Sequence, residues 1–106
     1  MSTRDGQRLR IYVGESDQYK GRPLYEWLVE TARNEGLAGA TVLRALEGFG
    51  SHSRMHTAKV LRLAQDLPIV IEIIDGGDAI EEFIRHIAPA VEDALVTTEH
   101  VEVRRK

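Results

Sequence analysis

The segment from Leu67 to Ile74, LPIVIEII, is apolar at nearly every position. A run this short, rich in isoleucine and valine, is typical of a β-strand, and the side chains of a strand alternate between its two faces. Both faces of this strand therefore need apolar cover. The chain has to supply that cover from its own helices, from other strands or from another molecule.

Three further strands are predicted around this one. Alternation of apolar and polar residues indicates strands over 8–13 and 97–104. The segment 39–47, GATVLRALE, is rich in β-branched and aliphatic residues and ends at the glycine pair of Gly48–Phe49–Gly50, which breaks regular structure. We therefore expect four strands, with the apolar one in the middle of a sheet or at an interface.

Two helices are predicted from apolar residues at helical spacing. The first covers 23–36, because Pro23 suits a first helical turn and Gly36 supplies a C-terminal stop. The second covers 78–89, where Asp78 and Glu81 are expected to form a capping pair and Pro89 ends or kinks the helix. The order of elements is then β-α-β-β-α-β.

That order in about 100 residues is typical of the α+β ferredoxin-like fold, an antiparallel four-stranded sheet with both helices on one face. The other face stays open, and apolar residues of strand 39–47, such as Val42 and Leu43, point to both sides. We expect the open face to pack against copies of the same chain, giving a homo-oligomer. A single domain is expected over 8–106, with 1–7 as a disordered tail.

Composition excludes several classes of protein. The 106 residues include no cysteine, which excludes disulfides, thiolate metal sites and thiol nucleophiles. A net charge of -3 argues against binding to a nucleic-acid backbone. No apolar run reaches the ~18 residues of a membrane span, and the first residues do not resemble an export signal, so we expect a cytoplasmic protein.

The connection over residues 48–66 is longer than two neighbouring strands require, and long connections are often functional. Gly48 and Gly50 with nearby hydroxyls and the basic residues Arg54 and Lys59 are the groups that phosphate recognition uses. No Walker motif is present, and taken alone the pattern favours an ordinary glycine-rich turn.

Other candidate residues each have a structural alternative. His52 and His56 lie four residues apart and would suit a transition metal, but the glycines just upstream and the absence of a nearby acidic ligand favour two solvent-facing loop histidines. Tyr19 and Phe49 would stack on a base or anchor a loop against the sheet. The sequence contains no convincing set of catalytic residues, so we expect no enzymatic activity.

Several motifs resemble one family closely. They are Tyr19–Lys20–Gly21 before Pro23–Leu24–Tyr25–Glu26, Gly39–Ala40–Thr41–Val42, Gly48–Phe49–Gly50 followed by Arg54 and His56–Thr57, and the final LVTTEHVEV. The chain is similar, from Leu9 to about Arg104, to the family called domain of unknown function 190, a branch of the PII-like proteins.

The resemblance implies a ferredoxin-like homotrimer that binds adenine nucleotides in clefts between subunits, with no required cofactor, and that presents residues 48–66 to a partner protein. By analogy with PII, Gly48 and Gly50 would hold phosphate together with Arg104 and Arg105 of an adjoining subunit; Arg44, Arg54 and Lys59 are further candidates. The resemblance also implies a membrane fluoride exporter as a candidate partner. Our leading hypothesis is a non-catalytic nucleotide sensor, and the alternative is a metal-responsive trimer that uses His52 and His56.

Overall fold

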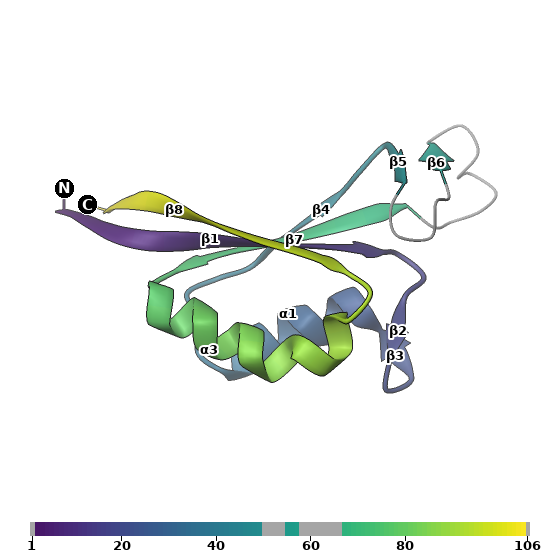
Figure 1. Ribbon diagram of the computed structural model, residues 1–106, viewed down its shortest axis with the longest axis horizontal. Helices are drawn as coiled ribbons and strands as arrows, with labels where there is room; N and C mark the ends of the chain where they lie inside the picture. The colour runs from purple at the N-terminus through teal and green to yellow at the C-terminus, as the bar shows by residue number, and fades with distance from the viewer. Residues whose placement is uncertain (1, 50–54, 58–66, 106) are drawn as a thin grey trace.

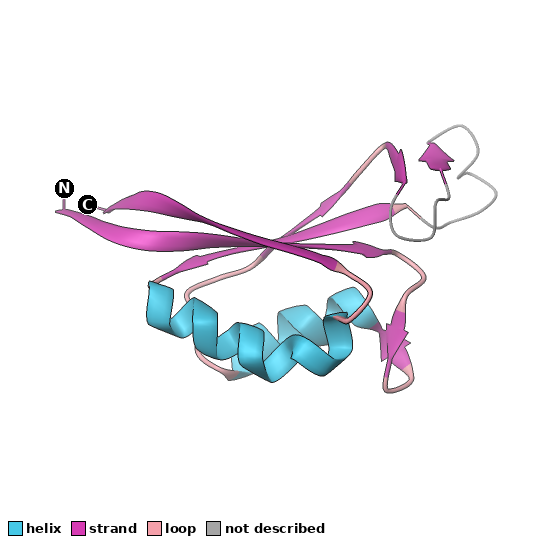
Figure 2. Cartoon of the chain, viewed as in Figure 1, coloured by secondary structure: helices cyan, strands magenta, loops and turns pink. Residues whose placement is uncertain are grey.

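The computed structural model describes residues 2–49, 55–57 and 67–105. Its main sheet is antiparallel and has the strand order β4-β7-β1-β8. These strands are β1 (Ser2–Gly14), β4 (Thr41–Arg44), β7 (Pro68–Asp75) and β8 (Leu95–Arg105). Helices α1 (Leu24–Asn34) and α3 (Gly77–Ile87) lie on one face of the sheet, as Figures 1 and 2 show. The expected ferredoxin-like α+β fold is confirmed.

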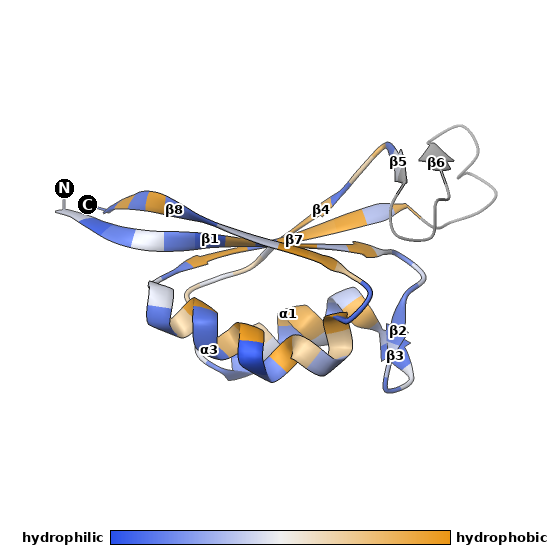
Figure 3. Ribbon diagram, in the orientation of Figure 1, coloured by the Kyte–Doolittle hydropathy of each residue, from blue (hydrophilic) through white to orange (hydrophobic). Residues whose placement is uncertain are grey.

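Alternating residues of the central strands build the core. Leu9 and Ile11 of β1 and Ile71 of β7 are fully buried against Leu28 of α1 and Phe83 of α3. In Figure 3, orange residues gather along β7 and recur along both helices, whereas the half of β1 near the N-terminus is largely blue. The apolar segment that begins at Leu67 is therefore a central strand, as the sequence predicts, and the helices cover one of its faces.

The opposite face of the sheet is open. Residues that pair directly across neighbouring strands share a face, and the register joins Leu43, Val70, Tyr12 and Leu95 into one apolar row across all four strands. Leu43 is 50% exposed and Leu95 is 60% exposed, because no element of this chain in the part described covers the row. The expectation of an uncovered apolar face is confirmed.

The first strand differs from the prediction. It begins at Ser2 rather than at residue 8, and its first half pairs with the end of β8, from Ser2 opposite Arg105 to Gln7 opposite His100. The expectation of a disordered tail over 1–7 was therefore wrong for residues 2–7. Their polarity gave no strand signal, and their order comes from pairing with a strand distant in the sequence.

Two short hairpins add to the predicted elements. The first joins β2 (Gln18–Tyr19) to β3 (Arg22–Pro23), and its turn residues Lys20 and Gly21 both have positive φ, 52° and 77°. Two left-handed residues are what a type I′ hairpin turn requires. The second joins β5 (Glu47–Phe49) to β6 (Met55–Thr57). The sequence predicted a break at Gly48–Phe49–Gly50, but β5 covers the first two of these residues.

The second helix also begins differently. Its N-cap is Gly76, with no side-chain hydrogen bond, so the capping pair predicted for Asp78 and Glu81 was wrong. Asp78 lies in the first turn instead, where a negative charge interacts favourably with the helix dipole. The helix ends at Ile87 and continues as a short 3-10 helix, η1 (Ala88–Val91), which contains Pro89.

Candidate functional site

The two ends of the long connection are held together at one edge of the fold. The Ala45 amide, directly after β4, donates to the Pro68 carbonyl at 2.8 Å. The Glu15 amide, directly after β1, donates to the Leu67 carbonyl at 2.9 Å. The connection between β4 and β7 therefore leaves and re-enters the sheet at a fixed point, which we call the loop base (Glu15, Arg44, Ala45, Leu67 and Pro68).

One carboxylate joins three parts of the loop base. Glu15 Oε1 accepts a hydrogen bond from an Arg44 Nη atom at 2.8 Å and a longer one from the Leu67 amide at 3.3 Å. The Arg44 side chain is 53% exposed, and that of Glu15 is 24% exposed. Arg44, one of the further candidates that the family resemblance suggested, is thus positioned by its own chain while its side chain remains half exposed to a ligand.

Gly48 has a packing role in β5. A Cβ atom at this position would lie 3.2 Å from Pro68 Cγ, closer than side chains normally approach. The glycine allows β5 to pass close to the start of β7. This contact accounts for Gly48 without a ligand, although it also places its backbone beside the loop base.

Several predicted residues lie outside the described part of the chain. These are Gly50, His52, Arg54 and Lys59. Phe49 and His56 belong to β5 and β6, where the register places Gly48 opposite His56 and Phe49 opposite Met55.

Tyr19 packs against the first helix. Its ring meets the ring of Trp27 edge to face at 4.7 Å, and Lys20 Nζ lies 5.5 Å from its centre. Tyr19 also packs on the hydrophobic core. These contacts indicate that Tyr19 anchors the β2–β3 hairpin, and they favour this role over stacking on a base.

Arg104 and Arg105 lie at the far end of the molecule from the loop base. They end β8 beside the N-terminus, whereas β5 and β6 lie at the opposite end of the long axis in Figure 1, which measures 46 Å. Arg104 pairs with Glu102 of the same strand at 2.6 Å. A single chain does not bring Arg104 and Arg44 together, so only a second copy would unite them.

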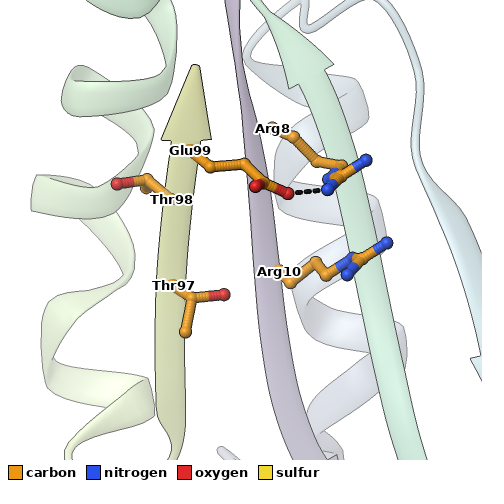
Figure 4. A pocket seen from close by; sticks show the side chains of 5 residues that line it. All are labelled: Arg8, Arg10, Thr97, Thr98 and Glu99. Carbon is orange, nitrogen blue, oxygen red and sulfur yellow. Dashed lines mark ion pairs between the residues drawn. The ribbon is translucent and has the colours of Figure 1, made fainter. Parts of the chain in front are cut away.

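A shallow hollow on the open sheet face was not predicted from the sequence. Arg8, Arg10, Thr97, Thr98 and Glu99 line it, and Arg8 and Arg10 extend side by side toward the next strand in Figure 4. Arg8 pairs with Glu99 on β8, and Arg10 donates to Glu72 on β7 at 2.9 Å, which raises the pKa of the Arg10 guanidinium. Each of these two arginines pairs with a carboxylate of a neighbouring strand. Alternating arginines on a strand were the only sequence signal for it.

In residues 2–49, 55–57 and 67–105, no three or more histidine and acidic side chains form a group that would hold a metal ion. No helix in the same part of the chain is long and apolar enough to cross a membrane.

Comparison with known proteins places the chain among uncharacterised relatives. Residues 6–103 match the DUF190 family model, described as an uncharacterized ACR. A UPF0166 protein of Aquifex aeolicus is 40% identical over 95 residues, which cover 90% of each chain. A UPF0166 protein of Methanocaldococcus jannaschii is 31% identical over 87 residues, covering 82% of this chain and 76% of the relative.

Solved structures with a similar fold are PII-like. CPII of Thiomonas intermedia, a nitrogen regulatory PII-like protein solved with ADP, AMP and bicarbonate, superposes with a TM-score of 0.76 at 19% identity, covering 98% of this chain and 92% of CPII. The apo form of CPII gives a TM-score of 0.68 at 15% identity, with 99% and 98% covered. At these identities the likeness establishes a shared fold.

Proposed function

Because the chain belongs to the DUF190 family and has the fold of PII-like proteins, we propose that it is a regulatory protein that binds an adenine nucleotide between subunits. The proposal follows the similarity to CPII, which was solved with ADP and AMP. It requires no catalytic step, only a ligand that binds two states of the protein with different affinity.

The observation that carries the proposal is the loop base. Arg44 stands, half exposed, where the connection to β7 begins, and a second arginine, Arg104, lies at the other end of the chain. A phosphate between two subunits would accept charge-assisted hydrogen bonds from both, each contributing about 1.5–3 kcal/mol. Gly48, Gly50, Arg54, Lys59 and Arg105 complete the proposed set of residues near the phosphates.

The open face of the sheet supports an oligomer, and the family resemblance points to a trimer. The row of Leu43, Val70, Tyr12 and Leu95 offers apolar surface that a second and a third copy would cover. A closed ring of three chains creates three equivalent clefts, and each cleft would unite the loop base of one chain with the C-terminal strand of its neighbour.

Regulation would act through residues 48–66. A nucleotide at the loop base would favour one arrangement of this connection, and a partner protein would bind that arrangement better than the other. A membrane transporter, such as the fluoride exporter that the family resemblance suggests, is the candidate partner.

Isothermal titration calorimetry tests the proposal directly. The purified oligomer is titrated with ATP, ADP, AMP and cyclic AMP, each with and without Mg²⁺. Binding of one of them with Kd near 10 μM, about -7 kcal/mol, is the expected result. If none of the four binds, the protein shares the PII-like fold without its ligand, and the proposed function fails.

A further inference from the structure

Arg44, which the proposed function places on a phosphate, already has an anionic partner within its own chain. Glu15 Oε1 lies 2.8 Å from an Arg44 Nη atom. We infer that Glu15 is an internal counter-ion, which the phosphate of a nucleotide must displace from Arg44, and that it thereby sets the affinity of the site. This inference rests on the proposed function and adds a residue that the sequence analysis did not select.

A phosphate can displace Glu15 from Arg44 at a small cost in free energy. An ion pair between partly exposed side chains is weak, and here the arginine is 53% exposed and the glutamate 24% exposed. A phosphate offers more charge and more acceptor oxygens than a carboxylate, and it binds a guanidinium through two parallel hydrogen bonds. A phosphate approaching while Glu15 stays in place would meet a like charge, so the carboxylate has to move away.

Displacement of Glu15 from Arg44 would also change a hydrogen bond of the polypeptide backbone. The oxygen of Glu15 that holds Arg44 accepts the Leu67 amide at 3.3 Å, at the residue where the long connection re-enters the sheet. The Glu15 amide binds the Leu67 carbonyl independently at 2.9 Å, so the backbone stays attached when the carboxylate moves. Occupation of Arg44 by a phosphate therefore changes the hydrogen bond of the Leu67 amide, a group that need not touch the ligand.

The variant Glu15→Gln tests the counter-ion. Glutamine keeps the size of the side chain and an oxygen that accepts the Leu67 amide, but it lacks the charge. ADP, used as the probe in calorimetry, should bind this variant about threefold to fivefold more tightly than the wild type, because no ion pair has to be broken. The matched control is Glu47→Gln, which removes the same charge from neighbouring β5 and leaves the Glu15–Arg44 pair intact.

A second measurement uses the unaltered protein. The NMR signal of the Leu67 amide should shift when ADP is added to the wild type, and it should shift less in Glu15→Gln. Unchanged or weaker ADP binding in Glu15→Gln, equal tightening in Glu47→Gln, or a Leu67 signal that ADP leaves unmoved would each overturn the inference while nucleotide binding stands. Failure of ADP and the other nucleotides to bind either protein would instead remove the proposed function itself.

Discussion

Gly6 of β1 lies directly against Val103 of the neighbouring strand β8. A Cβ atom on Gly6 would be 2.9 Å from Val103 Cγ2 and 3.1 Å from the Asp75 carbonyl oxygen. The crowding occurs where β7 ends and only β1 and β8 continue as a pair, since Gln7 opposite Asp75 is the last pairing between β1 and β7. A glycine is needed here because the carbonyl belongs to the backbone and cannot turn aside.

The substitution Gly6→Ala should therefore destabilise the fold by about 1 to 3 kcal/mol, the usual cost of an extra group in a filled space. Gly39→Ala is the matched control, because a Cβ there meets nothing within 4 Å. Chemical denaturation of both variants measures the difference. Equal stability of the two variants would mean that the strands adjust freely around residue 6.

The open sheet face yields a prediction about assembly. Leu43→Glu places a charge in the apolar row with Val70, Tyr12 and Leu95, and it should dissociate the proposed trimer because a buried unpaired carboxylate is costly. Val42→Glu is the control on the same strand, since Val42 pairs with Ile71 on the helix-covered face and is 41% exposed. Light scattering gives the mass of each variant. A trimer that survives Leu43→Glu, or a wild type that is a monomer, would contradict the proposed interface.

An ion pair on the outer side of the fold yields a prediction about pH. Arg22 donates to Glu30 at 2.7 Å and lowers the pKa of the Glu30 carboxyl. Because the folded-state pKa is the lower one, the pair adds stability above the pKa of an unfolded glutamate and loses it as the pH falls through the folded value. Arg22→Gln should raise the pKa of Glu30 toward its ordinary range and remove this part of the acid dependence.

Carbon NMR of the glutamate carboxyl groups during a pH titration measures that change. Glu82 serves as an internal control, since Arg85 lowers its pKa independently. Glu82 should titrate at the same pH in the wild type and in Arg22→Gln. An unmoved Glu30, or a parallel change in Glu82, would rule out the local ion pair as the cause.

Much of the fold was predictable because the signals were local. Alternation placed β1 and β8, the apolar run from Leu67 placed β7, and helical spacing placed α1 and α3. The first half of β1 was not predictable, since residues 2–7 are polar and owe their order to pairing with β8. The short β5 was missed because its glycine suggests a break, whereas in the fold Gly48 lies close to Pro68, whose Cγ a Cβ atom would approach to 3.2 Å.

The candidate site was less predictable than the fold. Arg44 was a further candidate suggested by the family resemblance, but its position depends on Glu15, which lies twenty-nine residues earlier in the chain. Glu15 follows β1 and Arg44 ends β4, and the two meet beside the start of β7. The spacing of residues along the sequence does not predict such a contact. The separation of Arg44 and Arg104 is likewise a property of the folded chain, since the ends of β4 and β8 lie far apart in Figure 1. A site that uses both arginines would therefore need a second subunit.

The central claim, a nucleotide held between Arg44 of one chain and Arg104 of its neighbour, is tested most directly by mixing two variants. Arg44→Gln and Arg104→Gln should each weaken ADP binding about tenfold or more, since each loses a charge-assisted hydrogen bond. The Arg104→Gln chain keeps Arg44, and the Arg44→Gln chain keeps Arg104. When equal amounts of the two variants are unfolded and refolded together, a cleft contains both arginines only if the first chain lies on its Arg44 side and the second on its Arg104 side. About a quarter of the clefts should meet this condition and bind ADP as the wild type does. Recovery of these sites in calorimetry is the predicted result. Full binding by either variant alone, or no recovery in the mixture, would contradict a site shared between subunits.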